Sequence, residues 1–543
     1  MIDPPVSSSN VGGTSEILPD DQLPPARGLF AISAGPIAGV MAWGLLRLFL
    51  PEVGEPGCRA AGVLAWMAVW WLGEVLPLGI TALLPLLLMP MLGILNTKEA
   101  AAPYADRVIF LFMGGFLLAL AMEKWGLHRR IALVVMRAIG VGPRRLVLGV
   151  MAATSLISMW VSNTATTLLM LPIALGIVSM VEARVGKRDK GFALSMILGV
   201  AYAASVGGVA TPIGSPPNAV LTSFLERTYG HAIGFGWWML AAVPFVAVFT
   251  GVMWAFLVFV ACPVRVGAIP GGQGMIRDEL EKLGPTTFAQ RGVMACFGLT
   301  VAGWVLREPA LLLLEALDVD GAAAFIKGGL DDAAVSMIGG LLLFLMPAFR
   351  AGGRRDKLMN WATAKKLPWD ILLLFGGGLC LAAGIQASGL DTTLGAKLSA
   401  IGGMPAWAVV LIAASISVFV SEFTSNVAQA NVFYPILAGV AGGAGIDPML
   451  LLFPCCIALS CAFMMPMGTP PNAIAFATGR VSIRQMAITG IGLNLLGIVL
   501  VVAFTLLVMT RVLGISLDGV PEWARRGAAP AVGTGLDAKG PSR

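Results

Sequence analysis

Charged residues are scarce in this sequence. They make up 12% of its 543 residues, whereas 57% are hydrophobic, and soluble globular proteins carry about 25% charged residues. A composition this poor in charge excludes a soluble globular protein. The net charge of +6 does not indicate a nucleic-acid partner, because membrane proteins concentrate Lys and Arg in their cytoplasmic loops.

Residues that commonly carry catalytic or metal chemistry are also few. The chain has two histidines and seven cysteines, and the cysteines lack the spacing of a metal site. Most of them lie in apolar segments, where we interpret them as small buried hydrophobes. The sequence contains no His-Glu-x-x-His motif and no recognisable Ser/His/Asp set, so we do not expect an enzyme.

Apolar runs of about 20 residues, the length that crosses a bilayer, fill most of the chain. They predict an all-α polytopic membrane protein with eleven transmembrane spans. Two longer stretches, 146–181 and 405–445, are interrupted halfway by polar residues, and we interpret each as a re-entrant hairpin of two half-helices. The predicted spans are about 29–50, 58–76, 78–95, 108–123, 191–225, 236–261, 291–306, 331–349, 369–386, 447–478 and 485–510.

The distribution of basic residues predicts the orientation. Most of the 36 Lys and Arg residues fall inside if the N-terminus is cytoplasmic, the C-terminus is outside and both broken stretches are re-entrant. Counting either broken stretch as two full spans leaves the later loops on the same sides, so charge does not decide between these topologies. We expect a protein of the plasma membrane, which in bacteria is the inner membrane.

The two halves of the chain resemble each other. LFMGGFLLALAMEKWGL (111–127) matches LFGGGLCLAAGIQASGL (374–390), and SNTATTLLMLPI (162–173) matches SNVAQANVFYPI (425–436), each at an offset of 263 residues. Each copy contains an odd number of predicted full spans, so the second copy is inverted. Inverted-topology repeats are typical of secondary transporters whose site lies between the repeats.

These matches divide the chain into six parts. The parts are a disordered cytoplasmic tail (1–28), a first span outside the repeat (29–57), repeat 1 (58–261), a cytoplasmic linker (262–290), repeat 2 (291–510) and a polar extracytoplasmic tail (511–543).

Helix breakers recur at corresponding places in the two repeats. Gly-Ser-Pro-Pro-Asn (214–218) matches Gly-Thr-Pro-Pro-Asn (468–472) at an offset of 254, and Ser-Asn pairs stand at 162–163 and 425–426. A half-helix that starts at a break presents free N–H groups and the positive end of its dipole, which can hold an anion without a buried Lys or Arg. The preceding half-helix presents free carbonyls, which suit Na⁺ together with Ser, Thr and Asn oxygens. The alternative is that these residues merely kink packed helices, which does not account for four breaks in symmetric pairs.

The paired Ser-Asn tips, the paired Gly-[Ser/Thr]-Pro-Pro-Asn breaks and the segment SCAFMMPMGTPPNAI (460–474) resemble the divalent anion:sodium symporter family of dicarboxylate, tricarboxylate and sulfate carriers. The similarity runs from about residue 29 to 511. It implies a homodimer in which each protomer has a scaffold domain and a moving transport domain. It also implies elevator-type alternating access, with 146–261 and 405–510 as the moving part.

The resemblance also implies roles for individual residues. One Na⁺ site would be formed by Ser158, Ser162, Asn163 and Gly214. The second Na⁺ site would be formed by Ser421, Thr424, Asn426 and Gly468, largely through carbonyl groups. The substrate carboxylates would meet Asn163, Thr164, Ser215, Asn426, Val427, Thr469 and Pro470.

Several residues depart from the family pattern or leave the function open. Val427 stands where many relatives have Thr, and Gln429 and Asn431 stand where small hydroxyl residues are common. We predict a C4-dicarboxylate such as succinate, moved together with Na⁺. The alternatives are a Na⁺-independent dicarboxylate exchanger of the same fold, a sulfate or tricarboxylate symporter, and an anion channel. Glu422, an acid in an apolar segment, could serve proton coupling or hydrogen-bond a nearby helix end.

Overall fold

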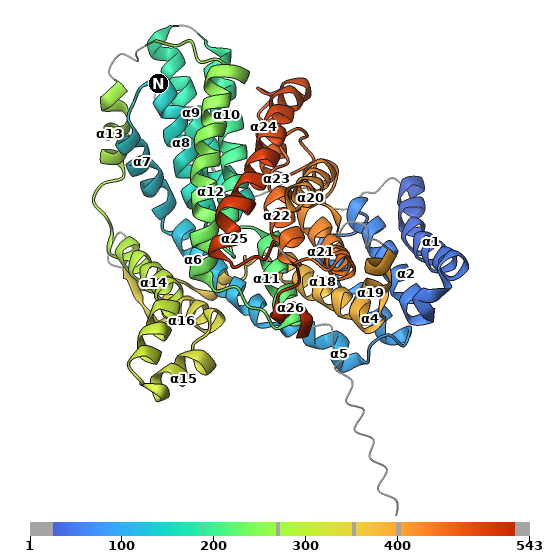
Figure 1. Ribbon diagram of the computed structural model, residues 1–543. Helices are drawn as coiled ribbons and strands as arrows, with labels where there is room; N and C mark the ends of the chain where they lie inside the picture. Colours follow the sequence, from blue (N-terminus) through green and yellow to red (C-terminus); the bar gives the residue numbers. More distant parts are fainter. Residues whose placement is uncertain are drawn as a thin grey trace, which may run out of the picture.

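The computed structural model describes residues 25–186, 188–267, 272–349, 355–397, 403–517 and 519–526 (Figure 1). Its elements are helices apart from one antiparallel pair of three-residue strands, β1 (Pro347–Phe349) and β2 (Arg355–Lys357). The predicted all-α class is confirmed for this part of the chain. Most of the predicted N-terminal tail, residues 1–24, and the end of the C-terminal tail, residues 527–543, lie outside the described residues.

Nine helices among the described residues are long and apolar enough to cross a membrane, and a bent helix pair could make a tenth. The protein is therefore built as an integral membrane protein. The nine are Phe30–Phe49, Thr97–Lys124, Asn163–Val185, Lys190–Ala210, Phe235–Ala261, Phe288–Ala316, Trp369–Ala387, Asn426–Ala444 and Ile483–Val512.

The predicted span 78–95 is not a single helix. It contains two short helices, α3 (Leu78–Thr81) and α4 (Leu84–Met91). Pro85 stands in the first turn of α4, where a residue without a backbone N–H is tolerated, whereas in a continuous helix it would remove a hydrogen bond. An apolar run of sufficient length was therefore not enough to predict one unbroken helix here.

The first half of the chain contains sixteen helical elements among the described residues. In chain order these are α1 (Pro25–Phe49), η1 (Pro51–Val53), α2 (Gly54–Leu72), α3, α4, α5 (Thr97–Ala101), η2 (Ala102–Ala105), α6 (Arg107–Lys124), α7 (Leu127–Ile139), α8 (Pro143–Ser158), α9 (Asn163–Val185), α10 (Lys190–Gly207), η3 (Gly208–Ala210), α11 (Pro216–Tyr229), α12 (Phe235–Ala255) and η4 (Phe256–Ala261).

The second half follows a similar order. After α13 (Gly272–Lys282) come α14 (Phe288–Ala316), α15 (Asp320–Gly329), α16 (Asp332–Leu345), α17 (Trp361–Ala364), α18 (Trp369–Ala387), α19 (Leu390–Lys397), α20 (Ala406–Ser421), α21 (Asn426–Ala444), α22 (Met449–Leu459), α23 (Pro470–Ala477), α24 (Ile483–Phe504), η6 (Thr505–Met509), α25 (Thr510–Val512) and α26 (Glu522–Arg526).

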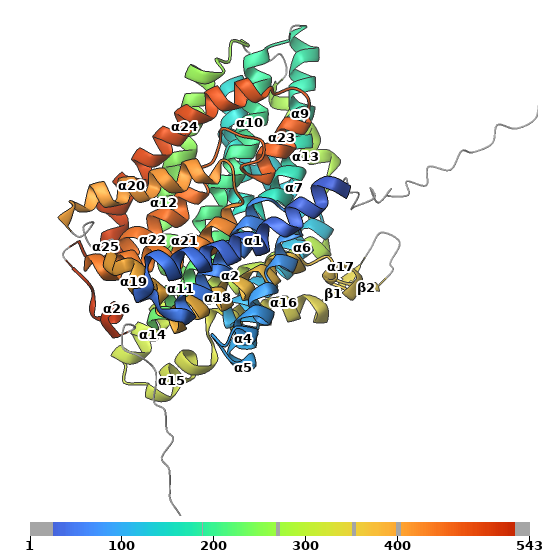
Figure 2. The same cartoon turned by 90° about the vertical axis from the view of Figure 1, so that its right-hand side faces the viewer.

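Four packing relations recur in the two halves. α8 packs on α10 as α20 packs on α22, and α9 packs on α10 as α21 packs on α22. α8 also packs on α12 as α20 packs on α24. The fourth relation crosses between the halves, since α9 packs on α23 and α21 packs on α11. In Figure 1, α14 to α16 lie at the lower left of the molecule and α1 and α2 at its right. Figure 2 shows α1 and α2 facing the viewer.

Ion pairs join α6 to α11 and to the start of α16. Arg107 at the start of α6 lies 2.6 Å from Glu226 of α11 and 3.3 Å from Asp331. Arg227 of α11 lies 2.5 Å from Asp106, which precedes α6. One arginine of α6 thus contacts acids on two different elements.

The segment after α25 is packed against the helices. Ile515 and Ala524 are buried, and the backbone N–H of Ser516 donates to a carboxylate oxygen of Asp447 at 2.8 Å. The indole of Trp523 stacks on the imidazole of His231, with ring centroids 4.2 Å apart. The start of the predicted polar tail 511–543 is therefore part of the folded structure. We call residues 515–517 and 519–526 the C-terminal strap.

Candidate functional site

The four interruptions expected from the sequence occur at the expected residues. Helices α9 and α21 begin at Asn163 and Asn426, directly after the two serines of the hairpin tips. Helices α11 and α23 begin at Pro216 and Pro470, because proline is favoured in a first turn and cannot continue a preceding helix. Each of the four motifs therefore creates a new helix N-terminus.

The tertiary structure brings the interruptions of the two repeats together. α9 packs on α23 and α21 packs on α11, so each hairpin contacts the helix that follows the break of the other repeat. The hydroxyl of Tyr434 donates to the carbonyl of Pro217 at 3.1 Å, and the hydroxyl of Tyr202 donates to the carbonyl of Phe463 at 2.9 Å. Each break is thus held by a tyrosine of the opposite repeat.

Oxygen atoms gather at the first hairpin tip. The hydroxyl of Ser158 lies 2.8 Å from the side-chain oxygen of Asn163 and 2.6 Å from the carbonyl of Ala204. A Cβ added to Gly208 would lie 2.4 Å from the same Asn163 oxygen and 2.8 Å from the carbonyl of Gly214. Glycine at 208 therefore allows the hairpin tip and the first break to approach each other closely.

The second hairpin tip repeats this arrangement. The hydroxyl of Ser421 contacts the side-chain oxygen of Asn426 and lies 3.0 Å from the carbonyl of Leu459. The hydroxyl of Thr424 lies 3.0 Å from the carbonyl of Val420. Ser421 and Asn426 stand 263 residues after Ser158 and Asn163, so the two clusters correspond.

The chemistry of these clusters fits a small hard cation. A hydroxyl carries one hydrogen, so Ser158 cannot donate to both of its oxygen neighbours at once, and neither can Ser421. Each cluster is satisfied either by turning the Asn amide so that its nitrogen faces the hydroxyl or by a cation between the oxygens. Hydroxyl, amide and main-chain carbonyl oxygens are the ligands that Na⁺ takes at broken helices.

The predicted substrate residues differ in burial. Ser215 and Thr469, the residues that precede α11 and α23, are buried. Thr164 and Val427 at the tips are half-buried, and Pro470 is exposed. All of these residues stand at the starts of α9, α11, α21 and α23.

The asparagines of the two Pro-Pro-Asn motifs have a function that the sequence analysis did not assign. The side-chain amide of Asn218 donates to the carbonyls of Gly208 and Thr211 at 3.0 and 2.8 Å. That of Asn472 donates to the carbonyls of Ala462 and Met465, both at 3.1 Å. The second asparagine and both residues whose carbonyls it binds stand 254 residues after the corresponding residues of the first motif. Both asparagines therefore fasten the loop that precedes their own helix, and the repeated motif was the signal for this.

Glu422 hydrogen-bonds the second break. The residue is 1% exposed, and its carboxylate accepts from the backbone N–H groups of residues 463, 464 and 465 at 2.8 to 3.0 Å. It also accepts from the side-chain amide of Asn494 at 2.6 Å. Of the two alternatives drawn from the sequence, hydrogen bonding is observed, but the partners are N–H groups of the loop between α22 (Met449–Leu459) and α23 (Pro470–Ala477) and not a helix end. The sequence analysis did not identify Asn494, although a single Asn in an apolar helix indicates a polar partner on another helix.

The two polar residues that depart from the family pattern bond differently: Gln429 of α21 reaches α20 and the loop between them, whereas Asn431 bonds within α21. The amide of Gln429 accepts from the hydroxyl of Thr424 and donates to the carbonyl of Ser417, both at 3.2 Å. The amide nitrogen of Asn431 donates to the carbonyl of Val427 at 3.1 Å. Its oxygen has no hydrogen-bond partner among the described residues. Gln429 therefore stabilises the second hairpin.

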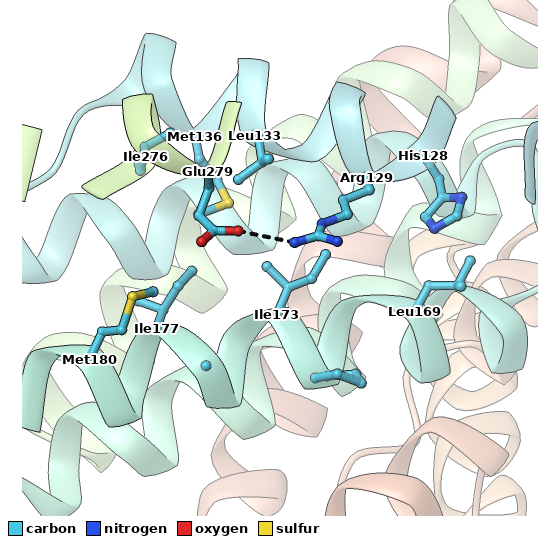
Figure 3. A pocket seen from close by; sticks show the side chains of 12 residues that line it. His128, Arg129, Leu133, Met136, Leu169, Ile173, Ile177, Met180, Ile276 and Glu279 are labelled. Carbon is cyan, nitrogen blue, oxygen red and sulfur yellow. Dashed lines mark hydrogen bonds and ion pairs between the residues drawn. The ribbon is translucent and has the colours of Figure 1, made fainter. Parts of the chain in front are cut away.

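A cavity of about 530 Å³ lies away from the tips, between α7, α9 and α13 (Figure 3). Its walls are mainly apolar side chains, including Leu133 and Ile177. Arg129 of α7 and Glu279 of α13, which also line it, form an ion pair of 3.0 Å. The residues that line it include no predicted substrate or Na⁺ residue, so we do not regard it as the transport site.

Comparison with known proteins places the chain in a family. Residues 41–515 match the family model described as the sodium:sulfate symporter transmembrane region. The chain belongs to the divalent anion:sodium symporter family. Family membership confirms the resemblance drawn from the motifs.

Two curated relatives of this family member are named sodium-dependent dicarboxylate transporter SdcS. The protein from Staphylococcus saprophyticus is 38% identical over 90% of this chain and 93% of its own length. That from Staphylococcus aureus is 37% identical over 90% of this chain and 94% of its own length. Among solved structures, Neisseria gonorrhoeae MtrF aligns with a TM-score of 0.50 at 13% identity, covering 78% of this chain and 86% of that one. At this identity MtrF shows similarity of fold alone.

Proposed function

We propose that the protein is a secondary active transporter that moves C4-dicarboxylates such as succinate across the plasma membrane together with Na⁺. The observation that carries the proposal is the pair of oxygen clusters at Ser158–Asn163 and Ser421–Asn426, each beside a helix N-terminus. The names of the two Staphylococcus relatives support both the dicarboxylate and the Na⁺ dependence.

The cation residues would act in two matched sets. Ser158, Ser162, Asn163 and Gly214 would hold Na⁺ at the first tip, and Ser421, Thr424, Asn426 and Gly468 would hold it at the second. When bound, Na⁺ supplies positive charge next to the substrate carboxylates. The close approach of Gly208, Asn163 and Gly214 keeps the hairpin tip and the break in reach of one ion.

The substrate residues would use helix starts in place of basic side chains. The first turns of α9, α11, α21 and α23 present N–H groups, and the segments 162–164, 214–218, 425–427 and 468–472 contain no Lys or Arg. Asn163, Thr164, Ser215 and Thr469 would add hydrogen bonds, while Asn426, Val427 and Pro470 would complete the pocket. The absence of a hydroxyl at Val427 reduces the donors available to one carboxylate.

Transport would follow an elevator mechanism within a homodimer. The moving part would comprise 146–261 and 405–510, and the remaining helices would form the scaffold. The recurring packing relations of α8, α9 and α10 with those of α20, α21 and α22 support two repeats, as an inverted-repeat transporter requires. The topology proposed is eleven spans with two re-entrant hairpins, a cytoplasmic N-terminus and an external C-terminus.

The experiment that tests the function is uptake of labelled succinate into proteoliposomes. Uptake driven by an inward Na⁺ gradient, and saturating with succinate, is the expected result. Uptake that requires internal dicarboxylate and does not depend on Na⁺ would select the exchanger. No uptake of labelled succinate, together with Na⁺-driven uptake of labelled sulfate or citrate, would change the substrate. A current without saturation or counterflow would indicate an anion channel.

A further inference from the structure

We propose that the cavity between α7, α9 and α13 binds an anionic phospholipid, with an acyl chain among the apolar side chains and the phosphate at Arg129. The proposal does not depend on which solute the protein transports. The cavity has a volume of about 530 Å³, within the range of about 300–1,000 Å³ that is usual for small-molecule sites. Such sites are mostly apolar with a few polar groups, and the polar side chains that line this one are those of His128, Arg129 and Glu279.

The apolar walls of the cavity come from facing helices. α9 contributes side chains at the spacing of one helix face, those of Leu169, Ile173, Ile177 and Met180. Figure 3 shows these side chains facing those of α7. Gly176 of α9 also lines the cavity, and a Cβ added to it would meet no atom within 4 Å beyond its chain neighbours and the helix backbone. Such a surface offers water too few polar partners, whereas an acyl chain gains from contact with apolar side chains.

The second repeat covers the corresponding helix face with protein. At the offset of 263 residues, α7 corresponds to α19 and Gly176 of α9 corresponds to Gly439 of α21. α19 packs directly on α21, and a Cβ added to Gly439 would lie 2.4 Å from the carbonyl oxygen of Asp391 in α19. α7 instead packs on α8 and α13. The same helix face is thus covered by a helix in repeat 2 and lies beside a cavity in repeat 1.

The side of the cavity formed by α7 is basic. Residues 124–181 include no Asp or Glu, and α7 has three arginines, whereas α19 has one Asp and one Lys. Basic segments next to a membrane attract anionic lipid headgroups, and basic pockets between helices bind them. The charge of α7 therefore favours a phospholipid with a net negative headgroup over a zwitterionic one.

Arg129 is positioned to bind a phosphate. Its Nη2 donates to a carboxylate oxygen of Glu279 at 3.0 Å, the one hydrogen bond of this side chain within the described residues. The side chain is 49% exposed, and in Figure 3 its guanidinium points into the space between α7 and α9. A guanidinium has several N–H donors in a fixed fork, so donors remain for a second acceptor. Contacts between Arg and phosphate are charge-assisted and are often bidentate.

The test measures lipid binding to the purified full-length protein in detergent, in a choline buffer without Na⁺ or substrate. Thermal unfolding is followed while dioleoylphosphatidylglycerol is added to the micelles, with zwitterionic dioleoylphosphatidylcholine as the reference. Native mass spectrometry shows whether the lipid is retained. We expect phosphatidylglycerol to give half of its stabilisation at a concentration about tenfold lower than phosphatidylcholine, because several arginines act on its net charge.

A side chain placed in the cavity should compete with the lipid. Gly176→Leu has open space around its Cβ and introduces a better helix former, so we expect a folded protein. The phosphatidylglycerol concentration for half of the stabilisation should rise at least about tenfold. Gly298→Leu is the matched control, because Gly298 lies within α14 and also has open space around an added Cβ. A full lipid response in Gly176→Leu would place the lipid elsewhere and overturn the proposal.

Two variants separate the binding of phosphate from the ion pair itself. Arg129→Gln and Glu279→Gln both break the ion pair, but only the first removes the proposed phosphate ligand. The preference for phosphatidylglycerol over phosphatidylcholine should disappear in Arg129→Gln and persist in Glu279→Gln. An equal loss in both variants would show that the ion pair acts through structure alone, and it would overturn the proposal.

The wild type provides two further decisive outcomes. If it shows no preference for phosphatidylglycerol over phosphatidylcholine, the anionic site is wrong. If phosphatidylglycerol stabilises the protein only after residues 1–24 have been removed, the cavity belongs to that segment of the chain and the proposal is overturned. Neither result bears on Na⁺-driven uptake, so this inference and the proposed function fail separately.

Discussion

Asn218 and Asn472 show how a single side chain can hold a broken helix in shape. Each is fully buried, and each donates both amide hydrogens to two carbonyls of the preceding loop. Those carbonyls have left the helical ladder and need donors, since an unpaired buried polar group is costly. In the Pro-Pro-Asn motif, therefore, proline interrupts the preceding helix and starts the next one. Asparagine donates hydrogen bonds to the carbonyls that the interruption leaves unpaired.

Removing one of these buried asparagine side chains should destabilise the protein. Asn472→Ala leaves two buried carbonyls without their donor, which corresponds to a loss of roughly 2–4 kcal/mol. The expected result is a clearly lower unfolding temperature in detergent. Asn96→Ala, which removes the exposed N-terminal cap of α5, should cost about 1 kcal/mol or less. Equal destabilisation by the two variants would contradict the fastening role.

The two tip asparagines should matter for transport more than for folding. Asn163→Ala and Asn426→Ala each remove an amide oxygen from an oxygen cluster, and we expect Na⁺-driven succinate uptake to fall by about tenfold or more. Gel filtration should show a folded protein in both cases. Asn360→Ala, a helix cap outside the repeats' tips, serves as the matched control. Unchanged uptake in both tip variants would end the assignment of the site.

At the scale of elements, the C-terminal strap ties the ends of two helices together. Trp523 of α26 stacks on His231, which follows α11, and Ser516 is bound to Asp447, which precedes α22. The strap thus connects one element of each repeat. Its position also brings a titratable ring into an apolar contact.

Burial lowers the pKa of His231, because an imidazolium is poorly solvated there. The folded protein therefore favours the neutral ring. The stability that this preference contributes is complete above about pH 6.5, the ordinary value, and is lost as the pH falls through that value toward the lower pKa of the folded state. We expect hydrogen exchange in the C-terminal strap to become faster as the pH falls from 7.5 to 5.5.

The matched variant for this prediction is His231→Phe, which keeps an aromatic ring against Trp523 but cannot be protonated. Exchange in the strap should then lose most of its dependence on pH after correction for the intrinsic rate. An equal pH response in the wild type and the variant would show that another group is responsible.

At the scale of the whole molecule, the ion pairs of Arg107 connect the two proposed domains. Glu226 belongs to the part proposed to move, whereas Arg107 and Asp331 belong to the proposed scaffold. An elevator motion has to break the contact between Arg107 and Glu226 but leaves that between Arg107 and Asp331 intact. The same arginine therefore provides both a test position and its control.

Cross-linking should distinguish the two contacts. A short thiol-reactive cross-linker applied to the double variant Arg107→Cys and Glu226→Cys should stop Na⁺-driven uptake almost completely. The same reagent on Arg107→Cys and Asp331→Cys should leave most of the uptake. The seven native cysteines are buried, and the single-cysteine variants control for their reaction. Full transport by the cross-linked first pair would contradict the elevator mechanism.

Much of this protein could be predicted from local chemistry. The low charge and the long apolar runs determine an all-helical membrane protein, because backbone groups in lipid must be paired within each segment. The breaks at 214–218 and 468–472 were predictable because Pro and Gly act on the chain next to them, whatever surrounds it. Those at 162–164 and 425–427 were predictable because polar residues interrupt apolar stretches that are too long for one span. The correspondence of Ser158 and Ser421, and hence the two oxygen clusters, followed from an offset that needs no coordinates.

Tertiary structure decided which distant groups meet. Glu422 is bound by residues 41 to 43 positions later and by Asn494, 72 positions later, and nothing local distinguishes this arrangement from proton coupling. The division of 78–95 into two helices and the packing of the C-terminal strap were likewise not evident from composition. Hydrophobicity along the chain determines which segments are buried, but the partner of a buried polar group depends on how those segments pack, which only the folded chain defines.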